Sequence, residues 1–421
     1  MPVTDQLAAR AAHYHDIILD VAYGPGGLLA SFVRYDTRRP FQEGETPHEY
    51  LTSHLDGVWG GNTPKPTIAD WLYGENTLWA TGWFLWSQIL RYRATQDAAA
   101  LITARKCFAD LNHLFQLSGQ IEPGLLGKPH GGRPGATTSF DQAASPVLFY
   151  AIYAQELATP AERAVAEANL AAHGEYYLRR NWVMNHHGHL TRIVDPAHTS
   201  TMKYLACIHA AYELTGEVRF RDAAFYYLRQ IQAGGRLPWP TNPYELNHNA
   251  YYYALLANYW SRSALAQEMD WIGYIDHYWR AMQLSFDAEG IYRFGAYDAV
   301  NHTFTPYPNQ WVDRSGADRL GVTDPSKNAR RWVSATSLSN RALTAGMAAA
   351  LGILAQSHGL DADAHQAARR ILLRLDEDKM RWWWDDGTLP TELKPLLNIF
   401  GPEVPAVWLV AYWHGRLIGA W

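Results

Sequence analysis

The chain has 421 residues, with 36 lysine and arginine side chains against 41 aspartate and glutamate side chains, so its formal net charge is −5. This balance argues against a non-specific nucleic-acid binder, because such a protein needs a basic face. With 48% hydrophobic and 18% charged residues, the composition predicts a large core and excludes a disordered chain. The 18 Trp, 25 Tyr and 13 Phe exceed what a core needs, so we expect some of them to line a cleft.

Two further classes of protein are excluded by short-range features. Cys107 and Cys207 are too few for a disulfide scaffold or a multi-cysteine zinc site, and both fall in helical patterns where a buried thiol is expected. The N-terminus carries no apolar segment typical of a signal peptide. No apolar run reaches the roughly 18 residues of a membrane span. We therefore expect a cytoplasmic protein without membrane partners.

Apolar residues recur with helical spacing through most of the chain. Thr159 and Pro160 mark one helix start, as N-cap and first helical residue. In chain order, the expected helices are 4–22, 75–95, 97–117, 139–157, 160–180, 199–214, 218–233, 243–260, 264–286, 335–357, 361–381 and 402 to the C-terminus.

These helices alternate between two compositions. Segments such as 199–214 and 335–357 are rich in alanine, glycine and aromatic residues, whereas 160–180 and 361–381 are amphipathic and charged. A helix that is apolar nearly all round is buried, and an amphipathic helix covers it. The pattern predicts an all-α (α/α)6 toroid, with an inner and an outer ring of six helices, that fills residues 1–421 as one catalytic domain. An open α-solenoid is the alternative, but the aromatic content favours a closed cavity.

The linkers that follow the outer helices also share a pattern. Linkers 181–195, 286–304 and 382–392 each place a turn signal between β-forming residues, which predicts short hairpins. The stretch 298–333 is expected to be a long irregular loop, and such loops usually serve as lids or walls.

In a toroid, these linkers lead into the N-terminal ends of the inner helices. Unpaired backbone N–H groups and the positive end of the helix dipole favour an anionic ligand there. At the first such junction, Asp70, Trp71 and Glu75 are candidates for acid–base chemistry and substrate binding. The alternative is N-capping by Asp70 and dipole pairing by Glu75.

The second junction is rich in glycine and proline, which predicts an irregular wall containing Lys128, His130 and Arg133. Asp141 then falls in the first turn of the next helix. It is the best single candidate for a catalytic carboxylate, and dipole stabilisation is its alternative role. We expect His130 to contact substrate.

Two other junctions offer cations and a ring for an acidic sugar. His198 and Lys203 lie where a helix begins, and Lys203 is placed to meet a carboxylate. Arg330 and Arg331 are suited to bidentate carboxylate binding, and Trp332 to stacking on a sugar face. Capping near His198 and an ordinary solvated arginine pair are the structural alternatives.

The fourth junction carries Glu245, Asn247, His248 and Tyr252. Asn, His and Tyr are the residue types that neutralise a sugar carboxylate and remove the proton beside it. Glu245 and His248 are three residues apart and therefore share one helix face. A core histidine satisfied by its neighbours is the alternative for His248.

Three histidines, His186, His187 and His189, suggest a metal site at first sight. Their spacing fits a hairpin turn better than helix-borne ligands, and no cysteine or carboxylate set accompanies them. We therefore predict no metal and no cofactor. At the last junction, Glu403 is interpreted as a structural residue.

Residues 70–106 resemble a repeat unit of (α/α)6-toroid carbohydrate enzymes, with Asp-Trp, a glycine-bearing aromatic helix and an RY-x-x-T-x-D hinge. Residues 210–228 repeat the hinge. Unsaturated glucuronyl hydrolases are similar in length and layout. The resemblance implies two carboxylates at inner-helix starts, one of which protonates an enol-ether double bond and activates water. Asp70 or Glu75 corresponds to the first, and Asp141 to the second.

The chain departs from that family in lacking its Asp-Asp and Arg-Gly-Gln-Ala-Trp motifs, so the resemblance rests on architecture. N-acylglucosamine 2-epimerases are similar in layout, but their paired histidine motifs are not evident. The sequence therefore predicts a glycoside hydrolase acting on uronate-containing, anionic oligo- or polysaccharides. A polysaccharide lyase using Asn247 and His248, with His or Tyr as base and acid, is one alternative. A non-catalytic sugar-binding scaffold and a sugar epimerase are the others.

Overall fold

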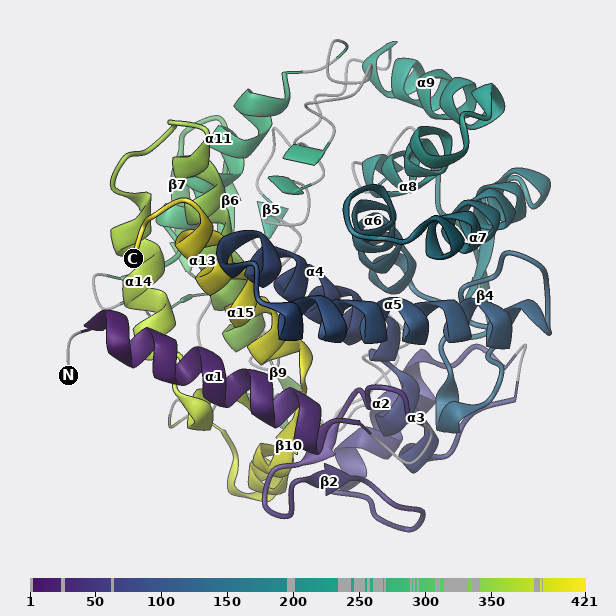
Figure 1. Cartoon of the computed structure of the whole chain (residues 1–421). Helices are drawn as coiled ribbons and strands as arrows, with labels where there is room; N and C mark the ends of the chain where they lie inside the picture. Colours follow the sequence, from purple (N-terminus) through teal and green to yellow (C-terminus); the bar gives the residue numbers. More distant parts are fainter. Residues whose placement is uncertain are drawn as a thin grey trace.

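A computed structural model of the chain shows two layers of helices arranged in a ring (Figure 1). The inner helices contact one another in the order α13–α15–α4–α6–α8, and each has an outer helix packed beside it. The inner helices are α4 (Thr77–Thr95), α6 (Phe140–Glu156), α8 (Thr201–Thr215), α13 (Arg341–Ser357) and α15 (Glu403–Leu417). The outer helices are α1 (Val3–Val21), α5 (Ala98–Gly119), α7 (Pro160–Arg179), α9 (Val218–Ala233), α11 (Trp271–Gln283) and α14 (Ala364–Arg374). The structure describes residues 3–23, 27–61, 64–194, 201–233, 244–245, 254–255, 258–259, 268, 270–287, 290, 292–293, 295–306, 311–313, 332–334, 341–381, 387 and 389–421.

The two compositions seen in the sequence correspond to the two layers. Helix α4 is buried at every residue from Thr77 to Leu90, whereas α14 buries only Ala364, Ala368, Ile371 and Leu372, which lie on one face. The predicted all-α toroid is confirmed. The inner helix predicted at 243–260 is wrong at its start, because residues 244–245 form a strand, so Glu245 does not lie on a helix face as predicted. Residues 254–255 and 258–259 are helical, and the rest of that range falls outside the described residues. The single-domain assignment stays a prediction.

Short elements that the sequence did not predict lie together at the bottom of Figure 1. They are α2 (Glu49–Val58), α3 (Ile68–Gly74) and a three-stranded antiparallel sheet in the order β10-β1-β2. The strands are β1 (Val33–Arg34), β2 (Arg39–Pro40) and β10 (Ile399–Phe400), and Val33 pairs with both Phe400 and Pro40. These elements enclose a small second core that includes Phe32, Leu55, Trp71, Leu72 and Leu396.

The predicted helix 75–95 is α4, which begins two residues later than expected, after a break that separates it from α3. Thr67 caps α3, with its Oγ1 accepting a hydrogen bond from the Asp70 N–H, and α4 begins only after Asn76. The Asn76 N–H donates to Ser31 Oγ at 2.6 Å instead of continuing the helical ladder. This break turns Glu75 and Asn76 towards the neighbouring linkers.

The linkers hold strands, as expected for the first of them. Strands β3 (Val183–His186) and β4 (His189–Arg192) form the predicted hairpin. In the second linker, β6 (Gly295–Asp298) pairs with β7 (Thr303–Pro306) and with β5 (Tyr244–Glu245). The turn expected at 287–290 carries one bridge, between Phe286 and Tyr292.

One other prediction about the linkers was wrong. The stretch 298–333 is not uniformly irregular, because β8 (Trp311–Asp313) pairs with β9 (Trp332–Ser334). The hairpin predicted for the third linker falls mostly outside the described residues, which continue after the linker as a 3-10 helix, η6 (Thr391–Asn398). Two shorter 3-10 turns are η1 (His130–Gly132) and η5 (Glu377–Met380).

The structure places both cysteines as the sequence predicts. Cys107 and Cys207 are buried and are not joined in a disulfide, and burial raises the pKa of the Cys107 thiol to about 12. Among the described helices, none has the length and apolarity needed to cross a membrane.

Candidate functional site

Side chains at the starts of three inner helices are joined by hydrogen bonds. The Asn76 amide, at the start of α4, donates to Glu403 Oε1 of α15 at 3.4 Å and accepts from Gln142 Nε2 of α6 at 2.9 Å. Gln142 Oε1 also accepts from the Trp79 backbone N–H at 3.2 Å, which satisfies a donor in the first turn of α4. These contacts hold the starts of α15, α4 and α6 together.

Glu403 is a buried titratable group at this junction. Its side chain is 2% exposed, and burial raises the pKa of the carboxyl to about 7. Oε1 accepts the hydrogen bond from Asn76, whereas Oε2 has no hydrogen-bond partner within the described part of the chain. A carboxyl with this pKa holds and releases a proton near neutral pH, which the interpretation of Glu403 as a structural residue did not anticipate.

The raised pKa predicts a stability difference between the wild type and Glu403→Gln. The ordinary pKa of 4.5 applies in the unfolded chain and a value of about 7 in the folded protein, so the folded state binds more protons between these values. This stabilisation is fully present below pH 4.5 and is lost as the pH rises through 7. Across this window, we expect the wild type to lose about 3 kcal/mol of unfolding free energy relative to the variant. Chemical denaturation on either side of the window measures it, and equal pH dependence in the two proteins would contradict it.

A second group of charged side chains, the Glu75 cluster, consists of Glu75, Lys128, His130 and His187. Three linkers supply them, one before α4, one before α6 and one before α8. The Lys128 ammonium pairs with Glu75 Oε1 and donates to His187 Nε2 at 2.7 Å. His130 Nε2 lies 3.3 Å from Glu75 Oε2, and His187 Nε2 lies 3.3 Å from Glu75 Oε1.

Protonation within the Glu75 cluster follows from burial and from neighbouring charges. Burial alone would raise the pKa of Glu75, but the Lys128 ammonium and the two imidazoles outweigh it and hold this pKa well below its usual range. Burial and the Lys128 charge lower the pKa of His187. Glu75 is therefore a carboxylate and His187 a neutral acceptor at neutral pH. The low pKa keeps Glu75 ionised and makes it a poor proton donor.

An aromatic ring covers this cluster. Trp59, which follows α2, stacks on His187 with ring centroids 5.6 Å apart and lies 5.7 Å from the ring of His130. The neighbouring Gly60 N–H donates to the His187 carbonyl at 2.6 Å. Trp59, which was not among the predicted site residues, is therefore the tryptophan ring that contacts this cluster.

The prediction that Trp71 contacts substrate is wrong. Its side chain is 2% exposed and packs in the small second core, where its ring lies 5.9 Å from that of Phe32. A sugar cannot stack on a ring enclosed in this way. The amphipathic pattern of the short helix α3 turns Trp71 inwards and Asp70 outwards.

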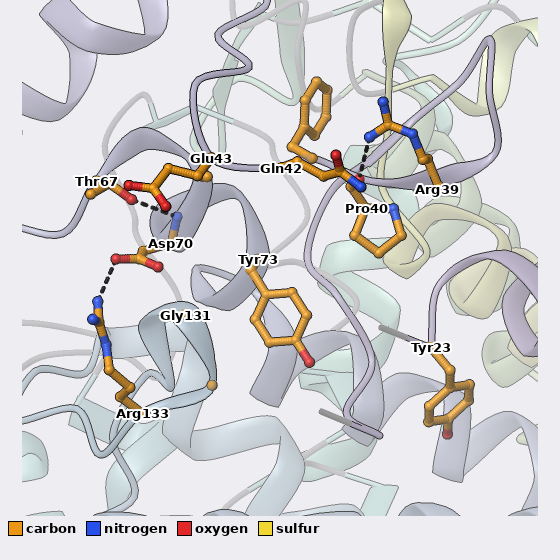
Figure 2. Close-up of a pocket in the computed structure, with 13 residues that line it drawn as sticks. Tyr23, Arg39, Pro40, Gln42, Glu43, Thr67, Asp70, Tyr73, Gly131 and Arg133 are labelled. Carbon is orange, nitrogen blue, oxygen red and sulfur yellow. Dashed lines mark hydrogen bonds and ion pairs between the residues drawn. The ribbon is translucent and has the colours of Figure 1, made fainter. Parts of the chain in front are cut away.

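Asp70 lines an open pocket of about 780 Å³ beside the Glu75 cluster (Figure 2). Its carboxylate pairs with the Arg133 guanidinium, and the ring of Tyr73 lies next to this pair. The full lining consists of Tyr23, Arg39, Pro40, Phe41, Gln42, Glu43, Thr67, Ala69, Asp70, Tyr73, Gly131, Gly132 and Arg133.

Two glycines allow the second linker to pass close to α3. A Cβ on Gly74 would lie 2.5 Å from the Pro129 carbonyl oxygen. Gly131 has a φ of +64°, and a Cβ there would lie 2.2 Å from Asp70 Oδ1. The glycine-rich wall predicted from the sequence is therefore the segment that carries Lys128 and His130 to Glu75 and Arg133 to Asp70.

For some of the remaining predicted site residues the structure describes the backbone alone, and the others lie outside the described ranges. Asp141 is in the first turn of α6, directly before Gln142, and Lys203 is in the first turn of α8. Glu245 is in β5 and Trp332 is in β9, and nothing is described of these four side chains. The predicted residues outside the described ranges are His198, Asn247, His248, Tyr252, Arg330 and Arg331.

The three histidines once considered as metal ligands lie in the β3–β4 hairpin, where His186 pairs with His189. Within the described ranges, no group of three or more His, Cys, Asp or Glu side chains is arranged to hold a metal ion. Sequence reasoning did not find the pairing of His187 with Lys128 and Glu75. The His-His-Gly turn marks the tip of the hairpin, but the contact depends on how the hairpin packs against the other two linkers.

Comparison with known proteins bears on the fold. No family model and no curated protein matches the chain. Among solved structures, the chain is similar to a crystal structure of D-mannose isomerase, with a TM-score of 0.53 and 13% sequence identity. The match covers 100% of this chain and 99% of that one. At this identity the likeness shows a shared fold over the full length.

Proposed function

We propose that this protein is a carbohydrate-processing enzyme that hydrolyses glycosidic bonds by general acid–base catalysis. The observation that carries the proposal is the hydrogen-bonded chain Glu403–Asn76–Gln142. It joins three helix starts, and each start has a carboxyl residue in it or directly before it, namely Glu403 in α15, Glu75 before α4 and Asp141 in α6. Glycoside hydrolases usually use a pair of catalytic carboxyl groups.

The pKa values of Glu403 and Glu75 are shifted in opposite directions. The pKa of Glu403 is raised to about 7 by burial, and that of Glu75 is held well below its usual range, where burial is outweighed by Lys128 and the imidazoles. An environment that separates the pKa values of neighbouring carboxyl groups is typical of acid–base enzymes, because one group then keeps its proton while the other is ionised. This separation supports acid–base chemistry at the helix starts.

The proposed substrates are uronate-containing oligosaccharides with an unsaturated terminal sugar. The helix N-termini favour an anionic group, and Lys203, Arg330 and Arg331 are the proposed partners of the sugar carboxylate. Asp141 would deliver a proton to the enol-ether double bond and then take a proton from the water that adds to the resulting cation, which gives a hemiketal. Opening of the hemiketal to a ketone leaves a hemiacetal at the anomeric carbon, and its collapse to an aldehyde breaks the glycosidic bond and releases the remaining sugar as an alcohol. This sequence regenerates the carboxyl group and needs no cofactor.

A sugar isomerase is the second candidate, and the likeness to D-mannose isomerase favours it. Isomerisation moves a proton between adjacent carbons and requires a base rather than a water nucleophile. A neutral histidine such as His187 is a suitable type of base. Fold likeness alone does not assign chemistry, so the hydrolase remains the first proposal.

Ultraviolet absorbance over time separates these reactions. An unsaturated uronyl hydrolase destroys the conjugated double bond, so absorbance should fall with unsaturated uronate oligosaccharides. A rise with saturated polysaccharides would instead identify the lyase that the sequence analysis left open. Formation of a ketose from D-mannose, without either change, would select the isomerase. If no substrate on the panel is turned over, the result favours the non-catalytic sugar-binding scaffold.

A further inference from the structure

The pocket in Figure 2 is lined by the part of the second linker that directly follows the residues contacting Glu75. Within this linker, Lys128 and His130 contact Glu75, whereas Gly131, Gly132 and Arg133 line the pocket. The other pocket walls come from α3, β2 and the segment after it. The pocket therefore adjoins the cluster but presents a separate set of side chains.

The lining combines aromatic rings with planar polar groups. Tyr23, Tyr73 and Phe41 contribute rings, and Asp70 and Arg133 contribute a carboxylate–guanidinium pair. Figure 2 shows Tyr73 between this pair and Tyr23. A volume of about 780 Å³ lies within the range of small-molecule pockets. Rings that cover apolar sugar faces, with planar groups for hydroxyls, are features suited to a saccharide.

The charges of the lining favour a neutral ligand. Arg133 is paired with Asp70, and Arg39 makes a bidentate pair with Glu45, at 2.6 and 2.8 Å. Glu43 adds a further carboxylate to the wall. An anionic ligand would have to displace a carboxylate from its arginine, whereas a hydroxyl-bearing ligand can add hydrogen bonds to both members of an intact pair.

We propose that this pocket is a subsite for one neutral sugar unit, held by the Asp70–Arg133 pair and covered by the ring of Tyr73. The inference rests on the proposed carbohydrate function and adds to it a recognition site for a neutral sugar, distinct from the helix starts. Adjacent hydroxyls of the sugar donate to the Asp70 carboxylate and accept from the Arg133 guanidinium. A substrate with an acidic sugar at the helix starts would thus have a neutral neighbour.

Isothermal titration calorimetry with cellobiose, maltose and D-glucuronate tests the subsite directly. We expect saturable binding of at least one neutral disaccharide, with a Kd at least tenfold higher in Arg133→Ala and in Asp70→Asn. Because the Arg133 side chain is 68% exposed, its removal should leave the fold intact. The matched control is Arg163→Ala, which removes another exposed ion pair, with Glu167, and should leave the Kd unchanged.

Three results would overturn the subsite. They are no binding of either neutral disaccharide, tighter binding of D-glucuronate than of both, or equal disaccharide affinity in the wild type and both pocket variants. The outcome is separable from that of the proposed function, because binding is measured without turnover. Arg133-dependent binding without any turnover would retain the subsite and reject the hydrolase, whereas hydrolysis without Arg133-dependent binding would do the reverse.

Discussion

Replacing Lys128 with methionine is expected to lower the free energy of unfolding by about 3–5 kcal/mol, because it removes one member of a buried ion pair. The Lys128 side chain is 1% exposed, and its ammonium is bonded to both Glu75 and His187. Methionine fills a similar volume, so the main loss is electrostatic: Glu75 keeps a charge in a buried position without its strongest partner. Urea denaturation at neutral pH measures the change.

A double variant separates charge from packing. In Glu75→Gln/Lys128→Met the orphaned charge is absent, so we expect part of the lost stability to return. Lys65→Met is the control, because Lys65 pairs with Asp56 on the surface and should cost at most about 1 kcal/mol. A loss in Lys128→Met no larger than in Lys65→Met would show that the buried pair does not stabilise the fold.

The ion pair and Glu403 act on stability in opposite pH ranges. The pKa of Glu75 lies below its ordinary value of 4.5, so its stabilisation is complete above pH 4.5 and is lost only as the pH falls through the folded-state pKa. The stabilisation from Glu403 is lost as the pH rises towards 7. The pKa values of Glu75 and Glu403 therefore shift in opposite directions, because Glu75 is buried beside the Lys128 ammonium and Glu403 beside an uncharged amide.

The fold was largely predictable because its signals are local and repeated. Alternating buried and amphipathic helices specify two layers, and the cap at Thr159 was read correctly, with Thr159 and Glu162 forming a reciprocal capping box in α7. The short helices α2 and α3 were missed, since each is stabilised by a core whose members are distant in sequence, such as Leu55, Leu72 and Leu396. The break at Asn76 was missed for the same reason, because its N–H bonds to Ser31.

The candidate site was predictable in its residue types but not in their pairing. The sequence analysis placed Glu75, Lys128 and His130 near helix starts, and the structure brings all three together. It could not assign Lys128 to Glu75, because that contact depends on a linker crossing α3 at Gly74. The burial of Trp71 and of Glu403 is likewise a tertiary property, and a carboxyl pKa near 7 arises only from such burial.

Asp141→Asn is expected to reduce kcat on an unsaturated uronate oligosaccharide by about 10²–10⁴-fold, the contribution of a general acid–base group. Asparagine preserves the shape of the side chain at the start of α6 but cannot deliver a proton. The loss of ultraviolet absorbance with time measures kcat. Asp222→Asn, which removes an exposed aspartate in α9, is the control and should retain wild-type activity.

The same assay, applied to Asp141→Asn and to His248→Ala, distinguishes hydrolysis from elimination. If the reaction is hydrolysis by carboxyl groups, Asp141→Asn fails while His248→Ala keeps turnover within about tenfold of the wild type, because a residue that only helps to position substrate contributes less than the proton donor. If the reaction is elimination, His248→Ala loses activity and Asp141→Asn keeps it, since a lyase needs a base beside the acidic carbon and no second carboxyl group. Full activity in Asp141→Asn would contradict the hydrolase proposal, because that proposal requires the Asp141 carboxyl group whatever Glu403 does.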